Sequence, residues 1–595
     1  MKVTLVPHTH WDREWYEPFD VFVERLVTMM DTLLDLAADG FPHFHLDGQT
    51  AMIDDYLERR PERAEELAQR VREGKLSAGP WVAQMDEFLV SGESHVRNLR
   101  MGLERARELG ADPKVGYLPD QFGHIGQMPR ILRDQGLGWA LVWRGVPRAI
   151  DRSTFRWRST DGEAEVLCEY MPFGYSAGAR LMQANEPEDL AREIRREIER
   201  MRPFLVDDRL LIMAGYDHAG PDATLPERLA QAQPVLDRIE AKIGSLDDHV
   251  EGRALGELPV WQGELRSGAR AHLLPNVVSA RVHQKRERGR VETLLERVAE
   301  PLAAGDPVSQ VALRGAWRLL VLSGAHDSAC GCSHDRVAAD VDARFAEARA
   351  IAEGVIRRAG GATDHATDGE PVAMRAIDGG LELDGIPVRF LDEPDVGDLY
   401  TFCWAEEGQA GSPPGRVRVD GDTFEAGWDG LGVTGRVTRN DDGVIVIDGA
   451  IRNERPDHRL RLHVGLDRPA TETLAGAPFE LVDRPLIGEG GEGEAPSPTW
   501  PARHVLLAGD TAVFHEGVFE YEIVDGREIA VTLLRCVGTI SRESLATRPW
   551  PAGPGTPTPQ AQMLGETAFL LGLRRDADRS SLVETWERSA LGRLP

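Results

Sequence analysis

The stretch Val6-Pro7-His8-Thr9-His10-Trp11-Asp12-Arg13-Glu14-Trp15 carries the first structural signal of this chain. It continues the apolar run Val3-Thr4-Leu5-Val6, which predicts a buried strand. In extended backbone, side chains two residues apart point to the same side, so His10 and Asp12 converge and His8 can join them. Imidazole nitrogen and carboxylate oxygen together suit zinc. A His-x-Asp pair also arises by chance in loops, so a metal site and an ordinary loop both stay open here.

The region that follows, to about residue 250, repeats the pattern that this strand begins. Short apolar runs alternate with charged amphipathic segments such as 61–74 and 186–201, which are typical of helices. Alternating strands and helices predict a mainly parallel sheet, either a barrel or a doubly wound sheet. Neither common type of glycine-rich phosphate loop is present, so a nucleotide cofactor is not indicated. The runs predicted as buried strands are 3–6, 44–46, 115–118, 140–143, 166–168 and 210–213.

The sequence pattern changes twice further along the chain. Residues 286–304, 309–324 and 337–358 carry apolar side chains at spacings of three and four, which predicts three consecutive helices. Residues 360–364, Gly-Gly-Ala-Thr-Asp, are typical of a linker. Beyond residue 370, Asp-Gly pairs recur between alternating runs, which is a strong hairpin signal and predicts an all-β sandwich region.

Composition excludes several classes of function. The chain of 595 residues has 98 acidic against 69 basic side chains and a formal charge of −29. A field of that sign repels phosphate backbones and anionic membranes, which argues against nucleic acid or a membrane surface as a partner. This negative field does not repel neutral substrates such as sugars.

Cysteine usage and hydropathy indicate the compartment. Five cysteines in so long a chain do not resemble a disulfide framework, which suits a reducing environment. The first residues lack a signal-peptide pattern, and no apolar stretch approaches the ~20 residues that span a bilayer. We therefore expect a cytoplasmic protein.

Three further segments combine acids or histidines with the end of a predicted element. Asp120 and Asp217 each follow a predicted strand, where parallel α/β folds place functional groups, although either acid can instead cap a helix or satisfy a loop. His326 follows a predicted helix and can complete a metal site, oriented by Asp327. The nearby Cys-x-Cys at 330–332 has no second pair, which is poor spacing for structural zinc.

Taken together, the four segments resemble glycoside hydrolase family 38, the α-mannosidases. The resemblance covers residues 1–340 and continues more loosely through 395–402 and 533–562. Asp47-Gly48-Gln49 and Leu273-Leu274-Pro275 also look like this family. The matching stretches, in the family's order, are His-Thr-His-Trp-Asp, Asp-x-Phe-Gly-His, Gly-x-Asp-His and His-Asp-Ser-x-Cys-Gly-Cys-Ser.

The resemblance implies a role for each matching residue. Asp120 matches the nucleophile as well as a metal ligand, and Asp217 matches the acid/base. A retaining glycosidase needs two such carboxyl groups, and the metal is expected to hold the mannose hydroxyls without activating water. His8 is expected to be a neighbour of the metal and not a ligand. The implied zinc ligands are His10, Asp12, Asp120 and His326, and the implied substrate-binding residues are Trp15, Arg144 and Asp327.

The expected architecture is a multidomain α/β, α and β protein. It comprises an N-terminal (β/α)7-type catalytic barrel over residues 1–255, a three-helix bundle over 256–362 and a β-sandwich-like region over 370–595. The family usually has a longer β-rich part, so we expect this region to be shortened. The resemblance is also compatible with a homo-oligomer.

Several functions remain open on sequence alone. The first is a zinc-dependent retaining α-mannosidase that acts on oligosaccharides or glycoconjugates. The substrate can instead be mannosylglycerate or its phosphorylated form. From other classes, a zinc-dependent polysaccharide deacetylase and a non-catalytic carbohydrate-binding protein remain, but the pair Asp120 and Asp217 speaks against both.

Overall fold

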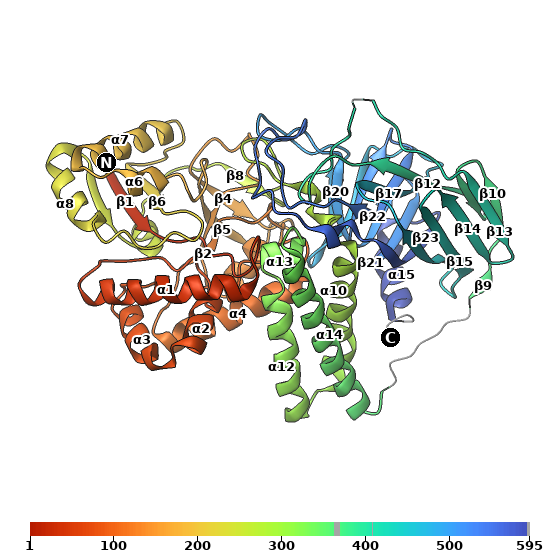
Figure 1. The fold of residues 1–595 in the computed structure, drawn as a ribbon, viewed down its shortest axis with the longest axis horizontal. Helices are drawn as coiled ribbons and strands as arrows, with labels where there is room; N and C mark the ends of the chain where they lie inside the picture. Colours follow the sequence, from red (N-terminus) through yellow and green to blue (C-terminus); the bar gives the residue numbers. More distant parts are fainter. Residues whose placement is uncertain (362–368, 407, 592–595) are drawn as a thin grey trace. The chain divides into compact units, whose positions relative to one another are not determined.

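The structure is a computed structural model that describes residues 1–361, 369–406 and 408–591 (Figure 1). It divides into two compact units, which we call the first and second unit. The first unit comprises residues 1–87, 94–273 and 324–326. The second comprises 88–93, 274–323 and the part of the chain from 327 onward. Most of the linker predicted at 360–364 lies outside the described residues.

Two largely parallel sheets form the centre of the first unit, as the strand and helix alternation predicts. β1 (Lys2–Pro7) and β2 (Val115–Leu118) are buried along nearly their whole length, which is typical of parallel strands that are covered on both faces. Only the β4–β5 pair is antiparallel. One sheet has the order β6-β1-β7, with β6 (Arg209–Ala214), β1 (Lys2–Pro7) and β7 (Glu240–Ile243). The other has the order β2-β3-β5-β4-β8, with β2 (Val115–Leu118), β3 (Trp139–Val142), β5 (Glu165–Tyr170), β4 (Thr154–Arg158) and β8 (Val260–Gln262).

The closed (β/α)7 barrel expected from the sequence is not confirmed. The described strands of the first unit form two separate ladders and no single ring. Isolated parallel bridges extend the first ladder, because His8 pairs with His45 and Phe44 pairs with Leu76. The 44–46 run that we predicted as a strand is therefore present only as bridge residues.

Most helices of the first unit bury their apolar faces in two cores, and of these two only the core of α7 (Pro187–Met201) and α8 (Leu225–Leu236) includes residues of β1 and β6. α1 (Phe19–Ala38) buries Leu26, Met30 and Leu34, spaced by four residues, in a core that also contains Leu46. The other helices are α2 (Ala51–Arg59), α3 (Ala64–Arg72), α4 (Gly92–Leu109), α5 (Met128–Asp134), α6 (Ala179–Gln183) and α9 (Leu246–Val250).

The three helices predicted for the middle of the chain are present in the second unit. They lie side by side (Figure 1). Their shared apolar core includes Trp317 and Phe345. The first predicted helix begins earlier than expected and changes to a π-helical turn at Leu295–Ala299. The helices are α10 (Val282–Leu294), α11 (Glu300–Leu302), α12 (Pro307–Leu322), α13 (His326–Cys330) and α14 (Asp335–Arg358).

The prediction of a large β-rich C-terminal region is confirmed. Antiparallel strands from β9 (Glu370–Pro371) to β23 (Gly565–Arg574) form one connected sheet system around a large apolar core, and α15 (Arg579–Leu591) follows them. The strands used below are β18 (Glu472–Ala477), β19 (Glu480–Pro485), β20 (Thr499–Ala508) and β21 (Thr511–Val524). The helices and this sheet fall into the same compact unit, so the predicted boundaries at 255, 362 and 370 stay predictions. Among the described helices, none is long and apolar enough to cross a membrane.

Candidate active site

The register of two parallel strands brings the N-terminal motif to Asp217. β1 and β6 pair in parallel up to Pro7 and Ala214, and the pairing continues beyond the strand ends to a bridge between His10 and Asp217. His218 N donates to His10 O at 2.8 Å, which holds the two segments together. Residues after the carboxyl ends of neighbouring parallel strands meet at the same edge of a sheet. Segments 200 residues apart in the sequence therefore lie side by side.

Asp120 and His326 reach the same edge from two other segments. Asp120 follows β2 by two residues. His326 N donates to Gln84 O at 2.9 Å, and Ala325 forms an antiparallel bridge with Met85. These backbone contacts position His326 within the first unit.

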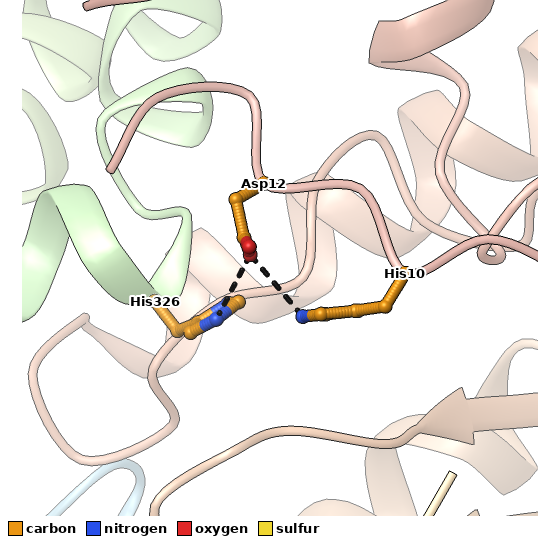
Figure 2. Close-up of side chains that lie close together, drawn as sticks. All are labelled: His10, Asp12 and His326. Atoms are coloured by element: carbon orange, nitrogen blue, oxygen red, sulfur yellow. Dashed lines mark ion pairs between the residues drawn. The ribbon is translucent and has the colours of Figure 1, made fainter. Parts of the chain in front are cut away.

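Four predicted metal ligands converge at this point. Figure 2 shows the rings of His10 and His326 on either side of the Asp12 carboxylate. Asp12 Oδ1 lies 3.2 Å from His10 Nε2 and 3.4 Å from His326 Nε2. Asp120 Oδ2 lies 3.6 Å from His10 Nε2 and 3.4 Å from His326 Nε2. The ligand atoms of His10, Asp12 and His326 all lie within 4.8 Å of one another, and Asp120 faces both imidazoles.

The charges around His10 favour a cation in the cluster. Its Nδ1 lies 3.0 Å from Asp47 Oδ2 and its Nε2 lies 3.2 Å from Asp12 Oδ1, so a carboxylate faces each ring nitrogen. Burial lowers the pKa of His10, but the charges of Asp47, Tyr175 and Asp12 outweigh it and raise that pKa well above its usual value. Positive charge, from a proton or a metal ion, is therefore favoured at this point. Two imidazole nitrogens with two carboxylate oxygens form a donor set that suits zinc and other divalent ions.

Asp47 is a further candidate site residue, to which no role was assigned from the sequence. Besides its contact with His10, its carboxylate accepts from Trp11 N at 2.9 Å and from Gln49 Nε2 at 2.8 Å. A carboxylate on the outer nitrogen of a metal-bound histidine fixes the ring and its tautomer. Its position directly after the predicted strand 44–46 could have identified Asp47 as a candidate from the sequence.

Replacement of Asp47 with alanine is expected to weaken binding of Zn²⁺ by roughly 10- to 100-fold, the usual cost of losing such a partner. Competition with a chromogenic chelator measures this affinity directly. Glu169→Gln is the matched control, because Glu169 is also a buried carboxylate of the first unit and pairs with Arg253 at 2.8 Å. Equal zinc affinity in Asp47→Ala and the wild-type protein would contradict the role of Asp47.

The Asp120 carboxylate is held ionised. Burial alone would raise its pKa, but Arg144 and hydrogen bonds from His10 and His326 lower the pKa of Asp120 well below its usual value. Arg144 Nη2 donates to Asp120 Oδ1 at 2.7 Å, and its Nη1 donates to His272 O at 3.0 Å. The guanidinium also lies 3.9 Å from the centre of the Trp143 ring. Arg144 is therefore fixed on three sides and presents its charge to Asp120.

The pKa of the Asp217 carboxyl is shifted in the opposite direction from that of Asp120. Burial, reinforced by the negative charges of Asp12 and Asp120, raises the pKa of Asp217 to about 6, although His10 and the Tyr175 hydroxyl oppose this shift. Tyr175 Oη donates to Asp217 Oδ1 at 2.8 Å. Neighbouring carboxyl groups with separated pKa values can act as a nucleophile and an acid. Tyr175 was not identified from the sequence, because no pattern connects it to Asp217.

Three other residues were singled out from the sequence: His8 as a neighbour of the metal, and Trp15 and Asp327 as substrate-binding residues. His8 is fully buried, and burial together with His10 lowers the pKa of His8 to about 3. The cluster of possible ligands comprises His10, Asp12 and His326, and the expectation that His8 is no ligand stays a prediction. Trp15 is half-buried against Tyr16, with ring centres 5.1 Å apart. Asp327 is buried and directly follows His326 in α13. The substrate-binding roles of Trp15 and Asp327 stay predictions.

Comparison with known families agrees with this arrangement. Residues 1–264 match the sequence model of the glycosyl hydrolases family 38 N-terminal domain. The N-terminal region of the chain is therefore similar to the family 38 hydrolases. One relative, a putative mannosylglycerate hydrolase of Halalkalibacterium halodurans, is 33% identical over 380 residues, which cover 60% of this chain and 42% of that protein. The α-mannosidase 2C1 of Mus musculus is 27% identical over 351 residues, which cover 56% of this chain and 32% of that protein.

A solved α-mannosidase structure has the same fold. An α-mannosidase from Enterococcus faecalis V583 superimposes with a TM-score of 0.86 at 23% identity, covering 100% of this chain and 89% of that one. The chain spans less than half the length of the curated relatives it matches. The family model covers residues 1–264, and the likeness to the solved structure shows the fold of the chain.

Proposed function

We propose that this chain is a family 38 enzyme, a metal-dependent, retaining α-mannosidase that removes terminal α-linked mannose. The observation that carries the proposal is the joint placement of Asp120, held ionised beside the two histidines, and Asp217, whose raised pKa keeps a proton available. Names of the relatives, which include several α-mannosidases, support the sugar class. Neither a deacetylase nor a binding module needs a second carboxyl group of this kind.

The proposed reaction has two balanced steps. In the first, the Asp120 carboxylate forms a bond to the anomeric carbon while the glycosidic C–O bond breaks, and Asp217 gives its proton to the departing oxygen. In the second, water attacks the anomeric carbon of the mannosyl-Asp120 ester, Asp217 takes the water's proton, and Asp120 leaves as a carboxylate. Two displacements at the same carbon return the product with the α configuration. Arg144 holds the Asp120 carboxylate in place for both steps.

His10, Asp12, Asp120 and His326 are the residues that would hold the metal ion, with zinc as the proposed ion. When bound, the ion supplies positive charge and a fixed template for sugar hydroxyls. Asp47 and the backbone contacts of His326 keep the two imidazoles in place.

The proposal is tested with an aryl α-mannoside as substrate. We expect the purified protein to release mannose, and proton NMR at early times to show the α anomer first. Transfer to methanol should give methyl α-mannoside. Inverted product contradicts the retaining mechanism, and absence of turnover on every α-mannoside contradicts the glycosidase assignment. Acetate release from an acetylated polysaccharide would instead identify a deacetylase, and sugar binding without products a binding module.

Removal of the metal is expected to abolish this turnover. Because the cluster holds the metal through only two imidazoles and two carboxylates, prolonged dialysis against a strong chelator should empty it, and added Zn²⁺ should restore the activity. Bound metal and rate are measured on the same samples. Full activity of protein without detectable metal would contradict the proposal.

A second candidate substrate is mannosylglycerate. It is favoured by the putative mannosylglycerate hydrolase at 33% identity, the highest identity among the relatives compared. The mechanism is unchanged, and only the leaving group differs. A kcat/KM for mannosylglycerate well above that for α-linked mannobiose would identify it as the better substrate, and the reverse ratio would favour a glycan.

A further inference from the structure

A second cavity, of about 650 Å³, lies wholly among residues of the second unit. None of the residues proposed for catalysis lines it. Its size is within the roughly 300–1,000 Å³ of typical small-molecule sites. We call it the β20 pocket, after the strand that forms one wall. The side chains that matter for its chemistry are Glu292, Glu296, Phe479, Arg503, His504 and Trp586.

A β-bulge forms the strand wall of the β20 pocket. The pairing of β20 with β21 changes register between Arg503 and Val505, and His504 has a left-handed backbone with φ of 65°. In a regular strand, neighbouring residues point to opposite faces, whereas a bulge redirects a side chain. Arg503 and His504 consequently both line the pocket, although they are adjacent in sequence.

The opposite wall has a second irregular element. α10 changes to the π-helical turn just before Glu296, and such turns are frequent at functional sites. Glu292 is paired with Arg288 at 2.9 Å and with Arg503. Glu296 accepts from Ser91 Oγ at 2.6 Å, and burial together with the charge of Glu292 raises the pKa of Glu296 to about 7. A carboxyl that is partly protonated at neutral pH can donate as well as accept a hydrogen bond.

Two buried donors or acceptors on the strand wall lack partners. Within the part of the chain that the structure describes, Arg503 Nη1 and His504 Nδ1 have no hydrogen-bond partner. The Arg503 side chain is only 9% exposed, so an unpaired donor there is costly. Burial lowers the pKa of His504 well below its usual value, which keeps the ring neutral. A ligand oxygen that reaches Arg503 would remove this cost.

Two aromatic rings, those of Phe479 and Trp586, line the β20 pocket. Phe479, in the β18–β19 turn, is 55% exposed although it is large and apolar. Trp586 of α15 stacks on His504 with ring centres 4.5 Å apart and an angle of 17° between the planes. Exposed and half-buried rings beside polar groups are a common way to bind the apolar face of a sugar ring.

The charges around the pocket select the class of ligand. Three guanidinium groups, from Arg297, Arg503 and Arg579, line it together with four carboxyl groups, from Glu93, Glu292, Glu296 and Glu480. Carboxylates repel a free anion and guanidinium groups repel a cation, so neither sign of ligand is favoured. A neutral ligand with many hydroxyl groups can donate to the carboxylates and accept from the guanidinium groups.

We propose that the β20 pocket is a second, non-catalytic binding site for a neutral sugar. Because the cavity contains no residue of the proposed active site, this inference does not rest on the proposed function. A hexose would lie against Phe479 or Trp586 and exchange hydrogen bonds with Arg503 and Glu296.

Isothermal titration of the full chain with methyl α-mannoside, methyl α-glucoside and α-linked mannotriose tests the proposal. The Asp12→Ala variant, dialysed against chelator, removes the contribution of the metal site. We expect saturable binding of at least one of these sugars by this variant, and a loss of about tenfold or more when Phe479→Ala or Trp586→Ala is added, as expected for loss of an aromatic contact.

Trp550→Ala is the matched control, because Trp550 is also 55% exposed but does not line the pocket. It should leave sugar binding unchanged. Melting temperatures identify any variant that has not folded, and saturation-transfer NMR on the folded ones gives an independent reading of binding. Inorganic phosphate should not compete. Absence of sugar binding, binding unaffected by both aromatic replacements, or displacement by phosphate would each overturn the proposal.

Discussion

The Asp120→Ala variant is expected to lose kcat for an aryl α-mannoside by on the order of 10⁴-fold, as is usual when a group that acts in the bond-forming step is removed. Two separate roles of Asp120 can contribute to this loss of kcat. Asp120 is the proposed nucleophile, and its Oδ2 also faces both histidine ligands at 3.4 and 3.6 Å. The rate loss by itself therefore does not distinguish a nucleophile from a metal ligand.

Rescue by azide separates these two roles. In Asp120→Ala a small anion can occupy the space of the lost carboxylate and attack the anomeric carbon, which gives β-mannosyl azide. Asp12→Ala loses a metal ligand but keeps the nucleophile, so azide should not restore it. Glu169→Gln removes another buried carboxylate with an arginine partner and should keep nearly full kcat. Failure of azide to rescue an Asp120→Ala protein that still binds zinc would contradict the nucleophile assignment.

Local sequence patterns predicted most of the fold. Apolar runs marked the strands β1, β2, β3, β5 and β6, because strands buried on both faces consist almost wholly of apolar residues. Segment 44–46 has the same pattern but forms only bridges. Pairing between strands depends on partners distant in sequence, so the closure of a barrel could not be derived from single runs.

The catalytic and metal-binding residues that we predicted from the sequence are acids and histidines that follow the end of a predicted strand or helix. His10, Asp12, Asp120 and Asp217 all follow strands, and the parallel register of β1 and β6 brings two of these segments together. Asp47 and Tyr175 could not be assigned in this way. Their roles depend on a contact with one atom, His10 Nδ1 or Asp217 Oδ1, and sequence spacing does not encode such contacts. The β20 pocket was missed for a related reason, since a β-bulge and a π-helical turn leave no periodic signal.

Replacement of Asp217 with asparagine is expected to reduce kcat/KM for a mannoside with a poor leaving group by roughly 10²- to 10⁴-fold, the usual contribution of a general acid. The loss should shrink with a dinitrophenyl mannoside, whose leaving group departs without a proton. The proton of Asp217 is present below its pKa of about 6 and is lost above it. The wild-type kcat/KM should therefore fall as pH rises through about 6, and this alkaline limb should be absent in Asp217→Asn.

Two comparisons make the Asp217 assignment specific. Asp247→Asn is the matched control, since burial also raises the pKa of Asp247, which accepts from Lys114 N at 3.1 Å away from the cluster. It should leave the pH profile unchanged. In Asp217→Asn, azide replaces the water of the second step and attacks the mannosyl-Asp120 ester, so the product should be α-mannosyl azide. The opposite anomers from Asp120→Ala and Asp217→Asn follow from attack on opposite faces of the same carbon. The same anomer from both variants would contradict the assignment of the two carboxyl groups.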